Sequence, residues 1–575
     1  MALTLKYTLP LVAAAMCLIS AATPDRPRTF ANPINIEYRF MTDLPSRREA
    51  ADPVIVLFGD DYYLFASKSG GYWRSKDMVD WTFIKPSGLP IEAYAPAVMA
   101  YQGALYYTAC NVGLYTTKDP KEGKWELIGK PFDVGDPDLF ADDDGRVYLY
   151  YGLSYNGGIF GMELDPRNQF QRIGEPFACF RSNYAQHGWE RRGEDNLGAP
   201  NGLTFQEGPW IEGSWMTKHA GVYDLQYAAP GTEFRTYADG VYTAPSPRGP
   251  FVYSQSSPFS HKPTGFITGA GHSATFADKQ GRYWHVATMR ISVKHQFERR
   301  LGVFPAEFDA DGVLRVNTLF GDYPQFTPAE RKDYGIDAGP NWMLLSYGRA
   351  AKASSSLDGH PPGDAFDEDV RTWWSARTPN PGEWLSVDLG KAGRIEAVQV
   401  NFAEHESTAL AGTTGLYHQY RLEMSLDGKT WEMLADRSAN RKDVPHDYIQ
   451  LSAPVTARFL RITNVRMPGG GPFSIRDLRA FGNGLSKPPA GAPQFEAHRD
   501  ASDARNAVVR WQIVPDAEGY VVRYGIAPGK LYHNLEIRGQ KEIVLHDLNA
   551  EAPYYFAVDA FNDSGRTPGT AVAAR

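Results

Sequence analysis

The sequence predicts an all-β protein in which a five-bladed β-propeller is followed by two β-sandwich domains. Five similar stretches of chain recur between residues 52 and 290. Aromatic residues make up 13% of the chain, which also contains 55 Gly and 41 Pro, a composition typical of many short strands joined by tight turns. Composition changes near residues 322–342 and 482–493 divide the rest of the chain into two further blocks.

Each recurring stretch passes through a turn containing Gly or Asp into a strand marked by an aromatic residue. The markers are Tyr62, Tyr106, Tyr148, Tyr223 and Tyr283. Successive markers are 44, 42, 75 and 60 residues apart. These intervals suit hairpin-based blades arranged around a central channel.

One position of the repeat is expected to carry the chemistry. Ten to twelve residues before the markers stand Asp52, Ala95, Asp136, Glu212 and His272. Four of these five side chains are ionisable. Because equivalent residues of propeller blades face the axis, the sequence predicts a single pocket that contains two Asp, one Glu and one His.

The domain boundaries follow from composition. We expect the propeller to span residues 30–325, and the polar stretch 322–342 to connect it to the next block. In residues 343–482, polar and apolar residues alternate as in an antiparallel sandwich. After the linker-like stretch 482–493, residues 493–575 contain short strands at the spacing of a small immunoglobulin-like sandwich. These connectors predict that both sandwiches fold apart from the propeller.

The N-terminus has the features of a cleaved signal peptide. Lys6 supplies a positive charge, residues 9–19 are apolar, and residues 20–22 are small, so we expect cleavage after residue 22. The protein is therefore expected to be secreted or periplasmic. No apolar run of about 18 residues follows, and no membrane span is expected.

Charge and cysteine content exclude some partners. The formal net charge is −8 and no concentrated basic run occurs, which argues against nucleic acid. After the signal segment only Cys110 and Cys179 remain, too few for a cysteine metal site. One disulfide between them is open, but Cys110 lies in an aromatic strand and fits a buried thiol better.

Several stretches resemble known families. Residues 30–325 resemble glycoside hydrolase family 43, a group of five-bladed propellers, through AADPVIVLFGDDYYLFAS, GDPDLFADDDGRVYLYYG, IEGSWMTKHAGVYDLQYAAPGT and GAGHSATF. Residues 343–482 resemble a discoidin (factor V/VIII C-type) jelly roll through AFDEDVRTWWSA, EWLSVDLG and RFLRI. Residues 493–575 resemble a fibronectin type III domain through Trp511, Leu548 and Tyr554.

The first resemblance implies an inverting glycosidase with three carboxylates. Asp52 is implied as the general base, Glu212 as the general acid, and Asp136 as the carboxylate that orients the acid and raises its pKa. Inversion needs a base that activates water on one face of the sugar and a protonated acid on the other. Three carboxylates in one dry pocket do not all ionise readily, so a protonated Glu212 is expected near neutral pH.

Two of these assignments have rivals nearby in the sequence. Glu207 also precedes a glycine, but it stands 16 residues before Tyr223, whereas Glu212 stands 11 before it and matches the other repeats. Asp138 lies on the same strand side as Asp136. The family pattern favours the aspartate before the proline, which is Asp136.

Further residues are candidates for contacts in the pocket. The resemblance places a histidine on the axis beside calcium or water, so His272 is either a metal contact or a hydrogen-bonded structural residue. Calcium prefers oxygen ligands. No cofactor is expected for catalysis, and a structural calcium remains open. The family also uses an arginine to contact the base or the substrate, which points to Arg299 or Arg300, with Arg299 in slightly better register.

Substrate contacts are expected from two other regions. Tyr94 precedes Ala-Pro in the second repeat, where relatives carry Trp, and is expected to shape the sugar pocket. The long insert at residues 177–206 is a candidate rim of the site. Within it, Trp189 and Arg191 are candidates for contact with the substrate, with an ordinary solvated loop as the alternative.

Two functions from different classes follow. The first is an exo-acting glycosidase that releases terminal α-L-arabinofuranosyl residues, with β-D-xylosyl and β-D-galactofuranosyl residues as alternatives. The second is a carbohydrate-binding protein that keeps the propeller without turnover, and the four phased ionisable residues favour the first. In both cases the partner is an oligo- or polysaccharide, and a monomer is expected.

Overall fold

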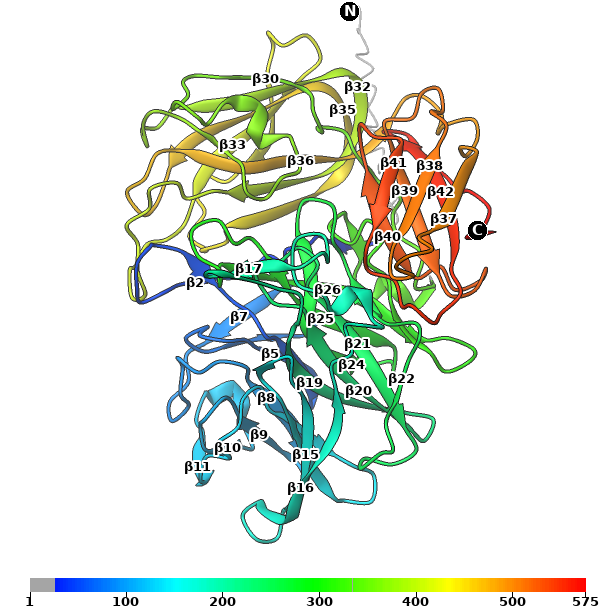
Figure 1. Ribbon diagram of the computed structural model, residues 1–575. Coiled ribbons are helices and arrows are strands. Elements are labelled where there is room, and N and C mark those ends of the chain that lie inside the picture. The colour runs from blue at the N-terminus through cyan, green and yellow to red at the C-terminus, as the bar shows by residue number, and fades with distance from the viewer. Residues whose placement is uncertain (1–25, 334) are drawn as a thin grey trace, which may run out of the picture.

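The computed structural model describes residues 26–333 and 335–575; the expected signal peptide at residues 1–22 lies outside them. The described chain is all-β and forms three units (Figure 1). A propeller occupies the lower part of the view, a second β domain lies above it, and a third lies beside both. No helix in the described ranges is long and apolar enough to cross a membrane.

The propeller consists of five antiparallel sheets, as the sequence predicts. Blade 1 contains β4 (Val54–Phe58), β5 (Asp61–Phe65), β6 (Tyr72–Ser75) and β7 (Trp81–Ile84). Blade 2 contains β8 (Ala97–Tyr101), β9 (Ala104–Thr108), β10 (Leu114–Thr117) and β11 (Glu126–Gly129). Blade 3 contains β12 (Asp138–Ala141), β13 (Val147–Tyr151), β15 (Gly158–Asp165) and β16 (Gln171–Arg181).

The last two blades have longer inner strands. Blade 4 contains β19 (Trp210–His219), β20 (Val222–Ala229), β21 (Ala238–Ala244) and β22 (Val252–Tyr253), with β14 (Ser154–Tyr155) and β23 (Ser260–His261) at its edges. Blade 5 contains β24 (Thr268–Ala277), β25 (Tyr283–Arg290), β26 (Arg299–Phe308) and β27 (Leu314–Val316). Short pairs join β1 (Thr29–Phe30) to β28 (Gln325–Phe326), β2 (Arg39–Phe40) to β3 (Arg48–Glu49), and β17 (Ala199–Asn201) to β18 (Thr204–Gln206).

The repeated turns explain why the five hairpins form. The first two strands of every blade are joined by a tight turn that contains a glycine in the left-handed region. These glycines are Gly59 (φ 60°), Gly103 (φ 76°), Gly145 (φ 83°), Gly221 (φ 84°) and Gly281 (φ 76°). Only glycine adopts such a conformation at no steric cost, so the turn residue fixes the register of each hairpin.

The second domain is a β-sandwich built on two long bent strands. β32 (Trp384–Phe402) and β35 (His446–Arg466) pair with each other and shift register between Asp388 and Gly393, where they pass from one layer to the other. The remaining strands are β29 (Met343–Leu344), β30 (Ala350–Ala353), β31 (Trp374–Ser375), β33 (Gln419–Ser425), β34 (Glu432–Asp436) and β36 (Ser474–Gly484). Apolar side chains between the layers form one core that includes Trp374.

The third domain packs two sheets around a separate core. One sheet contains β37 (Phe495–Arg499), β38 (Ala507–Trp511) and β41 (Glu542–Leu545). The other contains β39 (Gly519–Gly525), β40 (His533–Ile537), β42 (Tyr555–Asn562), β43 (Gly565–Thr567) and β44 (Val572–Ala573). Trp511, Leu548 and Tyr554 are all buried in the core between the sheets. Short 3-10 helices complete the chain at Pro120–Glu122, Gly188–Glu190, Glu330–Asp333 and Pro362–Ala365.

The two sandwiches pack against the propeller and do not stand free of it. The connector is not a free linker, because Tyr323 is 3% exposed and its ring lies 5.4 Å from that of Phe481 in the second domain. Phe320 packs in the same way against Phe561 of the third domain, with ring centroids 5.4 Å apart. Apolar residues of the connector therefore join the three cores.

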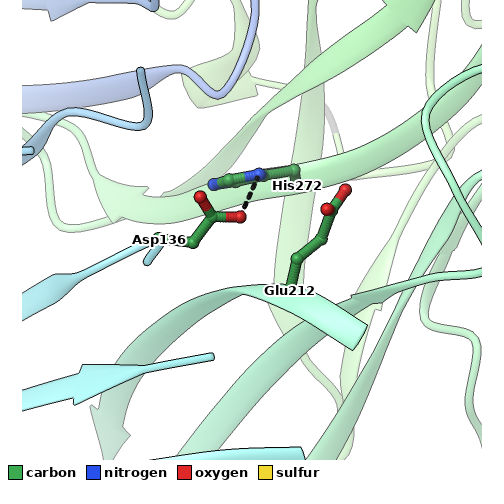
Figure 2. Close-up of side chains that lie close together, drawn as sticks. All are labelled: Asp136, Glu212 and His272. Carbon is green, nitrogen blue, oxygen red and sulfur yellow. Dashed lines mark ion pairs between the residues drawn. The ribbon is translucent and has the colours of Figure 1, made fainter. Parts of the chain in front are cut away.

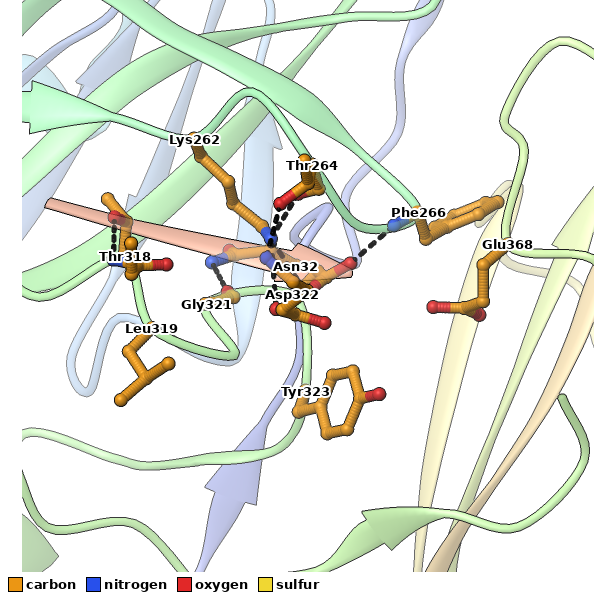
Figure 3. A network of polar contacts seen from close by, with 12 residues as sticks. Asn32, Lys262, Thr264, Phe266, Thr318, Leu319, Gly321, Asp322, Tyr323 and Glu368 are labelled. Atoms are coloured by element: carbon orange, nitrogen blue, oxygen red, sulfur yellow. Dashed lines mark hydrogen bonds and ion pairs between the residues drawn. The ribbon is translucent and has the colours of Figure 1, made fainter. Parts of the chain in front are cut away.

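Buried charges also cross the domain boundaries (Figure 3). Arg479 of the second domain donates two hydrogen bonds to Glu368 of the same domain and one, at 2.6 Å, to the carbonyl oxygen of Asp322. Asp322 in turn lies 3.0 Å from the ammonium group of Lys262, which lies 3.6 Å from the carboxylate of Glu536 in the third domain. A chain of charges thus links all three units, and its partners are far apart in sequence.

Replacement of Arg479 by Ala tests the contribution of this network. Arg479 is fully buried, and its removal leaves Glu368 without its charged partner. We expect the free energy of unfolding to fall by about 3–5 kcal/mol. The matched control is Arg458→Ala, because Arg458 holds Asp388 with the same two-bond geometry but is 42% exposed. Urea denaturation should show a much smaller change for the control; equal losses in the two variants would contradict this account.

Candidate active site

The chain adopts an unusual backbone conformation just before the inner strand of blades 1 to 3 and within the inner strand of blades 4 and 5. A residue in the left-handed region stands at or next to each phased position. These residues are Asp52 (φ 51°), Ala95 (φ 49°), Asp136 (φ 47°), Gly213 (φ 63°) and His272 (φ 40°). Non-glycine residues rarely adopt this conformation, and such residues concentrate at functional sites. The structural repeat therefore extends to the backbone at the axis.

The structure brings the four ionisable phased residues together. The Nδ1 atom of His272 lies 3.3 Å from Oδ1 of Asp52 and 3.5 Å from Oδ2 of Asp136. Ligand atoms of Asp136, Glu212 and His272 all lie within 4.8 Å of one another (Figure 2). The four side chains come from four different blades.

Asp52 is held in its ionised form. Burial opposes its charge, but the Arg299 guanidinium, the nearby His272 and a hydrogen bond from the Ser67 hydroxyl together lower the pKa of Asp52 below its usual value. Its backbone N–H donates to Oγ1 of Thr288 at 2.8 Å, which fixes the start of the strand. Asp52 is therefore a carboxylate that can accept a proton.

Glu212 has the opposite character. Burial raises the pKa of Glu212 to about 7, and the negative charge of Asp52 adds to the shift. The Tyr237 hydroxyl donates a hydrogen bond to Oε1 of Glu212, which favours the charged form and limits the rise. Near neutral pH a substantial fraction of Glu212 therefore carries a proton that it can donate.

Asp136, like Glu212, has a raised pKa. Burial raises its pKa well above the usual value, and the charges of Glu212 and Asp52 raise it further. The Cys110 thiol donates to Oδ1 of Asp136 at 3.2 Å, and the backbone N–H of Asp136 donates to the same sulfur at 3.1 Å. Because two adjacent buried carboxylates do not both ionise readily, Asp136 and Glu212 titrate as a pair.

The rival carboxylates lie elsewhere. Glu207 is exposed on the surface, whereas Glu212 is in the cluster. Asp138 is buried, and its carboxylate accepts a hydrogen bond from the backbone N–H of Met216 at 2.7 Å, a structural contact between neighbouring blades. The geometry therefore favours Glu212 over Glu207, and Asp136 over Asp138, as the carboxylates of the site.

The two candidate arginines differ in what they contact. Arg299 donates to Oδ1 of Asp52 at 3.3 Å and to Oε1 of Glu49 at 2.6 Å. Arg300 points the other way and donates to Nε2 of His446 in the second domain at 2.9 Å. Its prediction as a substrate contact is wrong, because consecutive residues of β26 face opposite sides of the strand.

The same alternation occurs on β3, which adjoins β26. Glu49 faces Arg299, while its neighbour Arg48 donates two hydrogen bonds, each of 2.7 Å, to Glu404 of the second domain. One face of each strand therefore supports the base, and the other is locked to the second domain. This support was not predicted from the sequence, because Glu404 is 356 residues away from Arg48.

The predicted contacts of the insert with substrate are not observed. Trp189 is fully buried in the core between blades 3 and 4, and its Nε1 atom donates to the Tyr253 hydroxyl at 2.8 Å. Arg191 is 3% exposed and binds the third domain through Asn506 and the carbonyl oxygen of His546. The prediction of both as rim residues is wrong: the insert seals a core and a domain contact.

Tyr94 lies in an aromatic and cationic wall next to the base. Its ring centroid is 6.0 Å from that of Phe297, and the ammonium group of Lys68 lies 4.4 Å from the Tyr94 ring. Phe297 in turn lies 4.9 Å from the guanidinium of Arg299. Tyr94 is partly exposed and so remains available to a ligand.

The cluster fits a metal ion poorly. Asp136, Glu212 and His272 could supply one ligand atom each, but calcium takes six to eight oxygen ligands. A bound cation would also require Glu212 to lose its proton, although burial favours the protonated form. Burial lowers the pKa of His272, so a neutral imidazole that hydrogen-bonds the carboxylates suits the site better.

Sequence reasoning missed several residues of the site. Tyr237 and Ser67 hydrogen-bond the acid and the base directly. Neither occupies the phased position, since Ser67 follows Asp52 by 15 residues and Tyr237 lies in a loop between β20 and β21. Cys110 was expected only as a buried thiol. Its position beside Asp136 carries no signal in the sequence.

Two known protein families match parts of this chain. Residues 46–314 match the family described as Glycosyl hydrolases family 43. This match covers the propeller and a little under half of the chain. Residues 350–478 match the F5/8 type C domain, in agreement with the resemblance of the second domain to discoidin modules.

Proteins similar to the propeller have names that denote several activities. A beta-D-galactofuranosidase of Aspergillus niger is 24% identical over 276 residues, which cover 41% of this chain and 72% of that protein. A xylosidase/arabinosidase of Butyrivibrio fibrisolvens is 26% identical, and the match spans 41% of this chain but only 48% of that protein. A thermostable family-43 glycoside hydrolase of known structure is 23% identical, with a TM-score of 0.41, over 52% of this chain and 99% of that chain.

Replacement of Tyr237 by Phe tests how the pocket sets the pKa of Glu212. The Tyr237 hydroxyl stabilises ionised Glu212, so its loss should raise the pKa of that carboxyl. If Glu212 must be protonated for turnover, the alkaline limb of the pH–rate profile should move from near pH 7 to higher pH. Tyr63→Phe is a matched control, because the buried Tyr63 hydroxyl has no hydrogen-bond partner. An unchanged limb in Tyr237→Phe, or a downward shift, would contradict the assignment.

Proposed function

We propose that the family 43 domain hydrolyses glycosidic bonds with inversion and releases terminal sugars from oligo- or polysaccharides. The observation that carries the proposal is the separation of two pKa values in one pocket. Asp52 is held ionised, while burial raises the pKa of Glu212 to about 7. An enzyme that needs one base and one acid at the same pH requires this arrangement.

In this mechanism Asp52 accepts a proton from the water that attacks the anomeric carbon. Glu212 donates its proton to the oxygen of the leaving sugar on the opposite face. Asp136 and its Cys110 partner orient the acid, and Arg299 keeps the base charged. No metal is needed for any of these steps.

We propose α-L-arabinofuranosyl residues as the first candidate substrate, with β-D-xylosyl and β-D-galactofuranosyl residues as alternatives. The relatives support this set, because their names include arabinosidase, xylosidase and galactofuranosidase. A non-catalytic role in glycan binding is the second function, but a pure binding protein would not need a buried carboxyl with a pKa near 7.

Further proposals concern the location of the protein and its two appended domains. We propose a secreted or periplasmic monomer in which the F5/8 type C domain contacts glycan. The third domain, with its two packed sheets and its core of Trp511, Leu548 and Tyr554, is proposed to be of the fibronectin type III kind.

Glu212→Gln tests the acid. We expect a loss of about 10²–10⁴-fold in kcat on natural oligosaccharides, and a smaller loss on 4-nitrophenyl glycosides, whose leaving group needs no proton. Arabinofuranoside, xyloside and galactofuranoside versions of the aryl substrate would also identify the sugar. Glu207→Gln is the matched control and should stay near full activity. Inactivation by Glu207→Gln alone would reject the assignment of the acid.

The stereochemistry of the product tests the base. If Asp52 activates water and does not attack carbon, the first sugar released should have the inverted anomeric configuration. Proton NMR during the first minutes of hydrolysis distinguishes the two anomers before they equilibrate. Release of the retained anomer would mean that Asp52 is a nucleophile.

A further inference from the structure

A polar cavity of about 400 Å³ lies where the three domains meet. The propeller contributes Glu194 and Arg235, the second domain contributes Glu368, and the third contributes Glu536 and Arg538. Its volume is within the range of small-ligand sites. The exposed side chains of Asp195 and Gln540 also line it, so it opens to solvent.

Buried polar atoms without partners line this cavity. His261 is 4% exposed, yet neither of its ring nitrogens has a hydrogen-bond partner. Asp547 is 5% exposed and its Oδ1 atom also lacks a partner. The two residues come from different domains, and Nδ1 of His261 lies 3.8 Å from Oδ2 of Asp547, too far for a direct hydrogen bond. Unpaired buried polar groups are costly, so these atoms are available to a ligand.

The charges of the lining restrict what the ligand can be. Carboxylates outnumber guanidinium groups around the cavity, which disfavours anions. Across residues 26–333 and 335–575, the only group of His, Cys, Asp and Glu spaced to hold a metal ion is the one in the active site. Burial lowers the pKa of His261 to about 3, so its neutral ring offers one donor and one acceptor. A hydroxyl group, which both donates and accepts, matches such a ring.

The lining also has an apolar part. The side chains of Leu535, Ile537, Val544 and Leu545 join the polar groups. The Tyr347 ring borders the same space and lies 4.1 Å from the guanidinium of Arg538. A sugar ring presents C–H groups on its faces and hydroxyls at its edge, and such a mixed wall is suited to both.

One loop of the propeller contacts both the cavity and the carboxylate cluster. Arg235 and Thr236 face the cavity, and the following residue, Tyr237, donates its hydroxyl to Glu212. A few residues earlier, Oγ1 of Thr232 accepts a hydrogen bond from Arg299, the partner of the base. One short loop, residues 232–237, therefore connects the two sites.

We propose that this cavity is a second glycan subsite, which binds a neutral oligosaccharide segment away from the bond that is cleaved. The subsite is formed only when all three domains are docked. It rests on the proposed function for the identity of the ligand as substrate, although its binding can be measured without turnover.

The test uses the full chain with Glu212→Gln, in which turnover of oligosaccharides is expected to be about 10²–10⁴-fold slower. Isothermal titration with arabinotriose, xylotriose and a galactofuranosyl trisaccharide should show two binding sites for at least one of them. Addition of His261→Phe should reduce the number to one. This substitution keeps a flat ring and removes no hydrogen bond within the protein, so folding should be preserved. His498→Phe, at a half-exposed site in the third domain, is the matched control and should leave two sites.

Kinetics give an independent readout in the active chain. We expect His261→Phe to raise KM for the trisaccharide about tenfold and to leave aryl-glycoside turnover unchanged. Asp195→Ala, at the exposed mouth, is a second variant in case the first does not fold, and should raise the same KM less. One binding site in every titration, or an unchanged KM in both variants, overturns the proposal. Absence of hydrolysis on every substrate would instead reject the proposed function, while two-site binding would still support the subsite.

Discussion

The site depends on one guanidinium among several carboxylates. Arg299 is 3% exposed and contacts both Glu49 and Asp52. Because it lies next to Asp52, it keeps that carboxylate charged, and the charge of Asp52 then helps to hold the proton on Glu212. The two carboxyl groups therefore differ because Arg299 lowers the pKa of Asp52, whereas burial dominates at Glu212 and raises its pKa. Burial alone would have raised the pKa of both.

Propeller closure places these groups, and the backbone makes the placement possible. Four blades carry a left-handed, non-glycine residue just before or within the inner strand, and the remaining blade has Gly213 next to Glu212. These conformations cost free energy, which the packed blades on either side must offset. Hydrogen bonds such as that from the Asp52 N–H to Thr288 of the neighbouring blade hold the strained residues in position. The pocket is thus a property of the closed ring and of no single blade.

Features that repeat along the chain could be predicted from the sequence. The glycine turns and the phased Asp52, Asp136, Glu212 and His272 are local signals that recur at regular distances, and the structure brings these four residues together. Trp189 could not be placed correctly, because its surroundings in sequence are those of a polar loop while its partners, such as Tyr227 and Tyr253, come from blade 4. The hydrophilic composition of residues 322–342 likewise indicates a free connector. A few apolar residues are nevertheless enough to pack this segment against the neighbouring domains.

The arrangement of the domains follows from the alternation of side chains along two strands. Glu49 and Arg299 face the base, so the intervening positions, Arg48 and Arg300, must face the opposite side of β3 and β26. Both are buried arginines, and their partners Glu404 and His446 belong to the second domain. Without that domain, two guanidinium groups directly behind the catalytic base would lose their buried partners. The second domain therefore stabilises the two strands that hold Glu49 and Arg299 beside Asp52.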